Sequence, residues 1–340
     1  MKFNQLGRSG LLVTDLCLGA MIFGEESTRG TPPAEAERMI NRYLDAGGNF
    51  IDTSDVYADG RSEEIVGRVI KEKRDQIVVA TKVRFASGQG PNDVGLSRRH
   101  ILQAAHASLR RLNTDYIDLY YMHGWDELTP LQESLRTFDE LVTAGKVRYI
   151  GVSNFKAWQV MKALALSDSS EWVRFVAGQY QYSLVKRDIE YEFSDLFLSE
   201  GIGLMPWGPL GGGFLSGKYR RDQRPQAASE GRIATTSDDT EEAWQRRNTE
   251  RNWHIVETVN EVAKERSATT PQVALAWLRA QPMITSVILG ARTLSQLEDN
   301  LGAADLELSA EEIAKLNQVS APPELNPYNL IEKWRRVPNP

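Results

Sequence analysis

The chain has 340 residues, of which 41% are hydrophobic and 25% are charged, a composition that supports a large buried core. The formal net charge of −6 disfavours nonspecific binding to nucleic acid or to an anionic membrane, because both need an excess of Lys and Arg. The single cysteine, Cys17, excludes an intramolecular disulfide and provides no zinc cluster, so it is predicted to be a buried strand residue. We therefore expect a protein that acts on a small molecule and has no metal site. The N-terminus lacks an apolar signal segment, which predicts a cytoplasmic location.

The chain opens with a predicted hairpin turned at residues 7–10, and then short apolar runs alternate with longer amphipathic stretches. The helical stretches open on Ser, Thr or Pro, and several close near Gly. Repeated strand–helix units require parallel strands with crossover helices, so the predicted fold class is α/β, a (β/α)8 TIM barrel. The predicted strands are residues 15–19, 49–53, 77–82, 116–123, 149–153, 175–179, 203–207 and 286–290.

Two segments depart from this alternation. Residues 219–250 are polar and far longer than the usual connection of roughly 2–6 residues, which indicates a functional loop; a disordered insertion is the alternative. The tail from residue 321 is rich in Pro and Trp, and we expect it to fold over the barrel mouth.

Polar residues follow the predicted strands, at the barrel end where catalytic groups gather in this fold. Each has an ordinary alternative: Asp52 can cap a loop, Tyr57 can be half-buried packing, and His100 and His106 fall in a helical pattern that favours a core or solvated role. Because polar residues occur together at several strand ends, a functional site is favoured over these alternatives. In chain order the strand ends carry Gly19, Asp52 with Tyr57, Lys82, His123, Ser153 with Asn154, Gln179, Trp207, and Gly290 with Arg292.

This set suits proton donation to a carbonyl oxygen. A tyrosine has a pKa of about 10, and a nearby ammonium such as Lys82 is predicted to lower the pKa of Tyr57. Asp52 would hold Lys82, while His123 would hydrogen-bond the carbonyl. Because no side chain donates hydride, a cofactor must supply it.

The dinucleotide fingerprint G-x-G-x-x-G is absent, and the glycine-rich segment is residues 206–219 instead. It looks like the phosphate loop of a nucleotide hydrolase, but Tyr219 follows Lys218 where Ser or Thr would hold Mg²⁺. The loop's backbone N–H groups and Lys218 still suit a pyrophosphate.

Two further residues suit a nicotinamide cofactor. Trp207 offers a flat face for the ring, with a core tryptophan as the alternative. Arg292 suits a ribose 2′-phosphate, and Gln296 and Asn300 follow at helical spacing, which is expected to place all three on one face. A solvated helix face is the alternative.

Taken together, these residues resemble the aldo-keto reductase superfamily, specifically its bacterial branch similar to the β-subunits of voltage-gated potassium channels. The resemblance covers nearly the whole chain and implies one barrel domain over residues 1–340. The motifs that carry it are LCLGAMIFG (16–24), DTSDVYADGRSEEIVG (52–67), SLRRLNTDYIDLYYMH (108–123), GKVRYIGVSNF (145–155), PLGGGFLSGKY (209–219) and ILGARTLSQLEDN (288–300).

The resemblance implies a catalytic tetrad of Asp52, Tyr57, Lys82 and His123. It implies that Ser153, Asn154 and Gln179 hold the nicotinamide carboxamide, that Trp207 stacks on the ring and that Arg232 clasps the pyrophosphate. NADPH/NADP+ is the implied cofactor, with NADH possible. The implied cofactor-binding set is Gly19, Met21, Asp52, Ser153, Asn154, Gln179, Trp207, Gly208, Pro209, Leu210, Gly211, Gly212, Gly213, Leu215, Lys218, Arg232, Gly290, Arg292, Gln296, Asp299 and Asn300.

Two departures from the family stand out. Gly208 replaces the usual Ser, which removes a possible hydrogen bond to the cofactor and is expected to reduce its affinity. Gln181 stands where this branch often has Glu.

Substrate contacts are expected from residues around the barrel mouth, and ordinary surface scatter is the alternative. The expected partner is a small carbonyl compound or alcohol, bound by a monomer or homo-oligomer. Two functions stay open: a reversible reductase with Tyr57 as general acid, and a nucleotide-binding, redox-sensing regulatory subunit. The substrate candidates are Met21, Phe23, Tyr57, Arg84, His123, Trp125, Tyr182, Tyr328 and Trp334.

Overall fold

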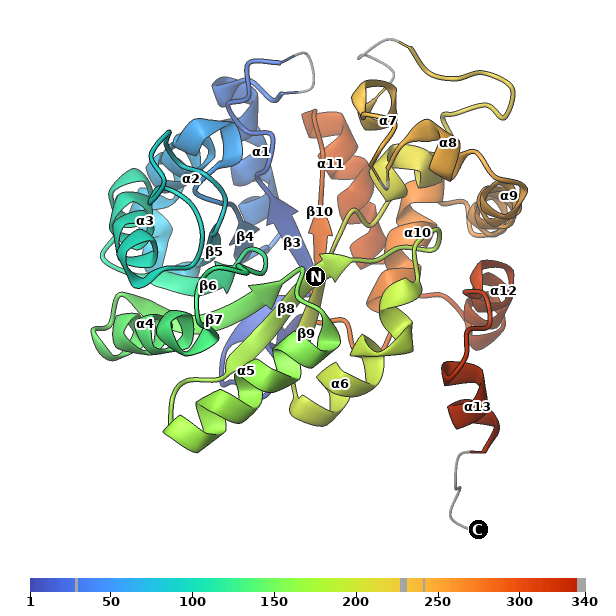
Figure 1. The fold of residues 1–340 in the computed structure, drawn as a ribbon. Helices are drawn as coiled ribbons and strands as arrows, with labels where there is room; N and C mark the ends of the chain where they lie inside the picture. Colours follow the sequence, from blue (N-terminus) through green and yellow to red (C-terminus); the bar gives the residue numbers. More distant parts are fainter. Residues whose placement is uncertain (28–29, 227–230, 241, 335–340) are drawn as a thin grey trace.

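The computed structural model describes residues 1–27, 30–226, 231–240 and 242–334. Eight parallel strands form one sheet in the order β10-β3-β4-β5-β6-β7-β8-β9, and helices surround it (Figure 1). All the predicted barrel strands are present, with bounds within two residues of those expected. They are β3 (Leu16–Gly19), β4 (Phe50–Asp52), β5 (Val78–Val83), β6 (Ile117–Met122), β7 (Val147–Ser153), β8 (Phe175–Gln181), β9 (Gly203–Trp207) and β10 (Val287–Leu289).

The two ends of the sheet meet at Leu204. Its N–H donates to the carbonyl of Met283 across 3.0 Å, and its own carbonyl accepts from the N–H of Thr285 across 2.9 Å. Since residues 283–285 lead directly into β10, these bonds bring β9 and β10 together. The sequence prediction of a (β/α)8 barrel is confirmed.

A hairpin closes one end of the barrel interior. Strands β1 (Phe3–Gln5) and β2 (Leu12–Thr14) pair antiparallel, as predicted, and Gly7 turns between them with φ 56°. A Cβ on Gly7 would lie 2.3 Å from the carbonyl oxygen of Val176, so only glycine fits there. The interior is lined by small and large apolar side chains, namely Leu6, Val13, Cys17, Phe50, Val78, Ala80, Leu119, Tyr121, Ala177, Met205 and Ile288.

The helices cover the outside of the sheet through a second, larger apolar layer. Several begin at hydroxyl caps: the hydroxyl of Ser97, as predicted, accepts from the N–H of His100, and Thr269 and Gln272 form a reciprocal capping box. The helices are α1 (Pro33–Asp45), α2 (Arg61–Ile70), α3 (Arg98–Arg111), α4 (Leu131–Thr143), α5 (Ala157–Ser170), α6 (Phe193–Glu200), α7 (Arg232–Thr235), α8 (Trp244–Arg247), α9 (Glu250–Glu265), α10 (Thr270–Arg279), α11 (Leu294–Leu301), α12 (Ala310–Ser320) and α13 (Tyr328–Lys333).

The long segment 219–250 carries α7 and α8, and its residues 227–230 and 241 lie outside the described part. Trp244 is buried against the rings of Phe214 and Trp253. The described part of this segment is therefore anchored to the body by aromatic packing.

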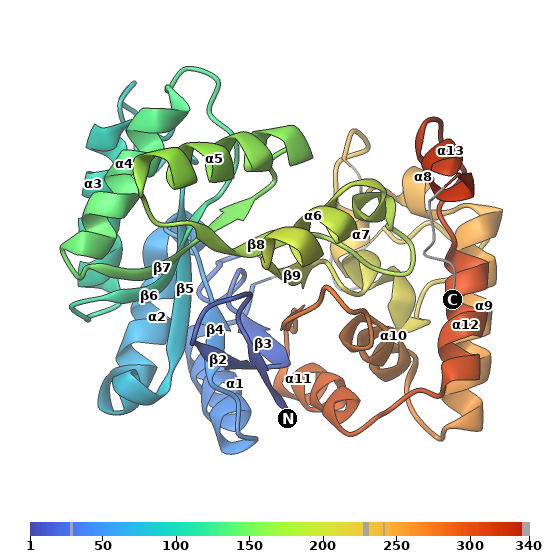
Figure 2. The ribbon, with the colours of Figure 1, turned by 90° about the horizontal axis from the view of Figure 1, so that it is seen from below.

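The C-terminal segment runs along the side of the molecule, where α12 packs beside α9 (Figure 2). Tyr328 in α13 stacks on Tyr191, which follows β8, with ring centroids 5.1 Å apart. Residues 335–340 of the predicted tail lie outside the described part. Within the described residues, no helix is long and apolar enough to cross a bilayer.

Candidate functional site

The predicted tetrad comes together at the ends of three neighbouring strands. Asp52 ends β4, Lys82 lies in β5 and His123 follows β6. The parallel register pairs Asp52 with Ala80 and Lys82 with Tyr121. Side chains far apart in the sequence therefore reach one cluster.

Lys82 is the centre of this cluster and is fully buried. Its Nζ donates to Oδ1 of Asp52 and to the carbonyl oxygen of Thr53, each across 2.6 Å, and to the Tyr57 hydroxyl across 3.2 Å. Burial lowers the pKa of Lys82, but the charges of Asp52 and Tyr57 outweigh it and raise the pKa overall. Lys82 is thus held as a cation.

Tyr57 begins the 3₁₀ segment Tyr57–Gly60, which leads into α2. The next two residues, Ala58 and Asp59, have φ of 49° and 56°, a conformation that costs non-glycine residues free energy. This loop turns the tyrosine hydroxyl onto Lys82.

The predicted direction of the Tyr57 pKa shift was wrong. Burial is the largest influence and raises the pKa of Tyr57 above 10, while Lys82 acts in the predicted, lowering direction without outweighing burial. Near neutral pH the phenol is therefore protonated, which is the form a proton donor needs.

His123 is a buried, neutral imidazole. Burial and the nearby charges of Lys82 and Arg84 lower the pKa of His123 to about 2. Its Nδ1 lies 3.3 Å from the hydroxyl of Ser54, and its ring lies 6.0 Å from that of Tyr57. A neutral imidazole can donate one hydrogen bond to a carbonyl oxygen.

The predicted carboxamide ligands form a chain of hydrogen bonds beside the tetrad. The hydroxyl of Ser153 donates to the carbonyl of Gln179 across 2.8 Å. The amide of Asn154 donates to that hydroxyl and to the carbonyl of His123, across 2.9 and 3.1 Å, and accepts from Nε1 of Trp207 at 3.3 Å. The Gln179 amide donates to Oδ2 of Asp52 across 2.7 Å. The two predicted groups of residues are thus directly linked.

The glycine-rich segment after β9 curls into a cradle. Gly208, Gly211, Gly212 and Gly213 all have positive φ, so the backbone turns tightly without side chains on this stretch. Within the same segment Pro209, Gly211 and Leu215 are buried, and Leu210 is half-buried.

Lys218 lies over this cradle, with Nζ 3.4 Å from the position a Cβ on Gly213 would take. Burial and the positive charge of Arg292 lower the pKa of Lys218. Because each of these two cations disfavours the charge of the other, a bound anion would stabilise both charges. A cofactor pyrophosphate or phosphate therefore fits here.

The described part of the long segment lies against the same cradle, since a Cβ on Gly212 would lie 3.3 Å from the side chain of Ile233. Arg232, at the start of α7, pairs with Oε2 of the buried Glu242 at 2.6 Å. Glu242 faces Gly208, because a Cβ there would lie 3.4 Å from Oε1 of Glu242. The prediction did not include Glu242, because one acidic residue among several in a polar segment carries no sequence signal for such a place.

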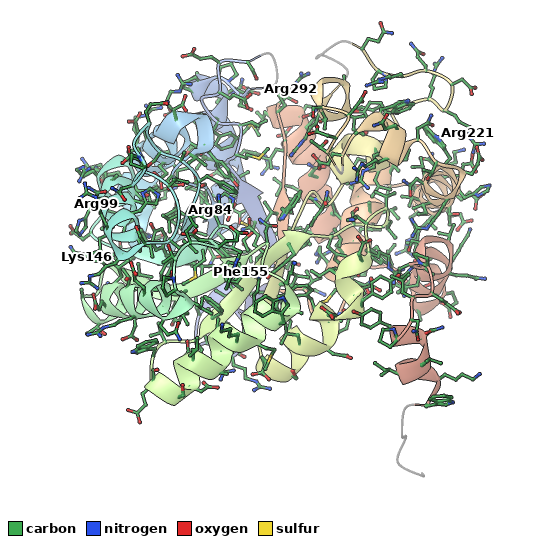
Figure 3. The ribbon with its side chains drawn as sticks, in the orientation of Figure 1. Arg84, Arg99, Lys146, Phe155, Arg221 and Arg292 are labelled. Atoms are coloured by element: carbon green, nitrogen blue, oxygen red, sulfur yellow. The ribbon has the colours of Figure 1, made fainter. Side chains whose placement is uncertain are left out.

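The predicted 2′-phosphate residues lie just before α11 and along it. Thr293 caps the helix, so Arg292 lies two residues before its first residue. The prediction that Arg292 shares a helical face with Gln296 and Asn300 was therefore wrong. The N–H of Arg292 donates to Oε1 of Gln296 across 2.9 Å, and Asn300 donates to the carbonyl of Gly290 across 3.4 Å. Figure 3 shows Arg292 at the upper edge of the molecule, near α11.

Asp299 points elsewhere. Its carboxylate accepts from Thr269 at 3.2 Å and from Gln272 at 3.1 Å. These bonds tie α11 to the start of α10. Of the remaining predicted cofactor residues, Gly19 ends β3 and Met21 is half-buried just after it.

Two predicted substrate contacts are corrected by the structure. Phe23 and Tyr182 are fully buried in the apolar layer, and the hydroxyl of Tyr182 donates to Glu190 across 2.5 Å. A single sequence does not distinguish an aromatic ring at the mouth from one packed beneath it.

Other residues near the tetrad are aromatic or cationic. Arg84 and Trp125 are half-buried, and Nε of Arg84 donates to the carbonyl of Trp125 across 3.0 Å. Trp125 packs edge-on against Phe155 at 5.1 Å; Figure 3 shows Arg84 and Phe155 toward the ring of strands. Phe85, which the prediction missed, is 41% exposed and contacts the His123 ring at 4.7 Å.

The tail aromatics lie farther out. The Tyr328 hydroxyl donates to Glu192 across 2.9 Å, and Trp334 is 74% exposed. Among the described residues, no group of three or more His, Cys, Asp or Glu side chains could hold a metal ion.

Comparison with known proteins decides the family. The model of the aldo/keto reductase family matches residues 15–321. The chain belongs to the aldo/keto reductase family. This aldo/keto reductase is 37% identical over 311 residues to a probable voltage-gated potassium channel subunit beta from Arabidopsis thaliana, covering 90% of this chain and 92% of that protein.

Two other relatives have enzyme names. An uncharacterized oxidoreductase, YrpG, from Bacillus subtilis is 36% identical, covering 94% of this reductase and 96% of the relative. Versiconal hemiacetal acetate reductase from Aspergillus parasiticus is 31% identical, covering 96% and 99%. The resemblance inferred from the motifs is confirmed, and the chain is an oxidoreductase of this family.

Proposed function

We propose that this aldo/keto reductase reduces an aldehyde or ketone to the alcohol, reversibly, with NADPH as the reductant and Tyr57 as the general acid. The observation that carries the proposal is the buried Lys82 ammonium held between Asp52 and the Tyr57 hydroxyl. NADH is a possible second reductant.

The proton step follows from this geometry. When the phenol of Tyr57 gives its proton to the carbonyl oxygen, the phenolate forms 3.2 Å from the ammonium of Lys82. An ion pair in this dry site is much stronger than in water, which stabilises the product of proton transfer. The neutral His123 would donate a second hydrogen bond to the same oxygen and orient it. Solvent reprotonates Tyr57 after the alcohol leaves.

The bound nicotinamide would supply hydride to the carbonyl carbon. Ser153, Asn154 and Gln179 would orient its carboxamide, and Trp207, half-exposed beside Asn154, would cover its ring. The glycine cradle with Lys218 and Arg232 would hold the pyrophosphate. Arg292, beside Lys218, would take the 2′-phosphate, which favours NADPH.

The substrate is proposed to be a hydrophobic or ring-bearing carbonyl compound. Phe85 and Trp125 offer aromatic faces next to His123 and Arg84, and such faces bury apolar rings effectively. Arg84 allows a polar or acidic group at the edge of the substrate.

The test is turnover of a panel of aldehydes, ketones and quinones, followed by loss of reduced-nicotinamide absorbance. Tyr57→Phe is expected to lower kcat by at least about 100-fold while binding NADPH as the wild type does. Tyr191→Phe, in the segment after β8 and outside the cluster, is the matched control and is expected to keep full turnover. Unchanged turnover in Tyr57→Phe would overturn the assignment of the acid.

A second function is favoured by the relatives named as potassium channel β-subunits. In it the protein binds the nucleotide and reports its redox state to a partner, with little turnover. Tight NADPH binding without turnover of any panel compound would support this function over the first.

A further inference from the structure

We propose that Ser54 and Asp55 form a proton relay that sets the tautomer of His123, so that carbonyl reduction requires Asp55 to be protonated. Both are positioning residues that act through His123. The inference rests on the proposed function for its effect on turnover, but the relay itself is a property of the protein alone.

The geometry is a continuous chain of three buried side chains. The Ser54 hydroxyl lies 3.3 Å from Nδ1 of His123 and 3.0 Å from Oδ1 of Asp55. All three residues are less than 9% exposed. Within the described part of the chain, Oδ2 of Asp55 is buried and accepts no hydrogen bond, which is costly for an ionised carboxylate.

The groups around Asp55 oppose its ionisation. Burial and the charge of Glu63, from α2, raise the pKa of Asp55 to about 7, against the smaller lowering by the Ser54 hydroxyl, by Arg111 of α3 and by the Val56 N–H. Glu63 itself accepts from Nε of Arg111 and from the Thr81 hydroxyl, each across 2.6 Å. Asp55 therefore changes charge near neutral pH.

The side chain of Tyr120, from β6, adds no counter-charge to this environment, because burial first, and then the charges of Asp55 and Glu63, raise the pKa of its hydroxyl well above 10. On the other side of the relay, His123 faces the cations of Lys82 and Arg84 and keeps a single ring proton. With His123 neutral, its one ring proton can lie on either Nδ1 or Nε2.

With Asp55 ionised, the one hydroxyl proton of Ser54 points to the carboxylate. The Ser54 oxygen then accepts from Nδ1–H of His123, and Nε2 has no proton to give to a substrate. With Asp55 protonated, its O–H donates to Ser54, Ser54 donates to Nδ1, and the ring proton moves to Nε2. Only this second arrangement donates to a carbonyl oxygen.

The relay is tested without cofactor by ¹⁵N NMR of the histidine ring nitrogens, with His123 assigned by its loss in His123→Gln. In the wild type the His123 proton is expected to move from Nε2 to Nδ1 between about pH 5.5 and 8.5. Asp55→Asn keeps a donor toward Ser54 and should hold the proton on Nε2 throughout. Ser54→Ala should abolish the pH-dependent move.

The matching kinetic test compares kcat over the same pH range. The wild type should lose at least about tenfold in kcat as the pH rises, while Asp55→Asn should stay at the low-pH rate. Asp59→Asn, on the exposed end of the same loop, is the charge-matched control and should follow the wild type. The Tyr57 pKa is raised above this range, so its own titration does not produce the change.

A His123 tautomer that stays constant with pH in the wild type, or a tautomer change that persists in Asp55→Asn, would overturn the relay. A tautomer change of the expected kind in a protein that turns over no carbonyl compound would support the relay and overturn the proposed function instead.

Discussion

The side-chain amide of Gln179 donates a hydrogen bond to Oδ2 of Asp52 across 2.7 Å, from 127 positions along the chain. Asp52 also accepts from Lys82 through its other oxygen. One carboxylate thus joins the proposed carboxamide site on β8 to the proposed acid on the loop after β4. We therefore expect a ligand bound at the proposed carboxamide site to influence the position of Lys82 through Asp52.

Gln179→Met is expected to destabilise the protein by roughly 1.5–3 kcal/mol, because the buried, charged carboxylate of Asp52 loses a hydrogen-bond donor. Denaturant unfolding measures the change. Gln181→Met is the matched control: it lies two residues on in the same strand, and its Nε2 has no partner among the described residues, so its loss should cost under about 0.5 kcal/mol. Equal losses for the two variants would contradict the proposed role of the Asp52 bond.

Lys82→Met is expected to cost about 3–5 kcal/mol and to abolish turnover, since it leaves the buried Asp52 carboxylate without its cation. The double variant Lys82→Met with Asp52→Leu removes that unpaired charge and should recover most of the stability without activity. Urea unfolding and turnover are measured on the wild type, the single variant and the double variant. A double variant no more stable than the single one would show that the ion pair is not the cause.

Arg292→Ala is expected to weaken NADPH binding by about 10- to 100-fold and to leave NADH binding nearly unchanged, because the loss is that of a charge-assisted hydrogen bond to the 2′-phosphate. Quenching of tryptophan fluorescence gives both dissociation constants. Arg221→Ala, which removes an arginine paired with Glu250 and Glu257, should change neither dissociation constant. An unaltered preference for NADPH would refute the 2′-phosphate assignment.

His123→Asn is expected to protect the protein against acid. The native pKa of His123 is about 2 against 6.5 when exposed, so between those values the unfolded chain binds the extra proton and stability falls as the pH falls. The slope is about 1.4 kcal/mol per pH unit, and the variant should lose that slope while the wild type keeps it.

Unfolding free energies of His123→Asn and wild type are compared from pH 7.5 down to pH 4.5. Asp55 acts in the opposite direction, because its raised pKa makes the folded state bind more protons between about 4 and 7. The quantity to compare is therefore the difference in unfolding free energy between the variant and the wild type at each pH, and not the slope of either protein alone. A difference that does not change with pH would contradict a neutral, buried His123.

Several features could be predicted from the sequence because they depend on local pattern and on chain topology. Apolar runs separated by capped helices predict the strands, and parallel strands all end at one edge of a barrel. The strand pattern therefore predicts that Asp52, Lys82 and His123 lie together, as they do in the structure. The glycine cradle was located in the same way, because glycines with positive φ cluster where the backbone turns tightly.

Other features were decided by tertiary structure alone, because burial and electrostatics sum over groups that are distant in the sequence. Phe23 and Tyr182 are buried rather than at the mouth, and burial outweighs Lys82 in raising the pKa of Tyr57. Ser54 and Asp55 stand between two predicted catalytic residues, yet only the folded chain brings them to His123. The sequence by itself determined which side chains reach the strand ends; tertiary packing decided their protonation states, because the dielectric surroundings of each group come from the whole fold.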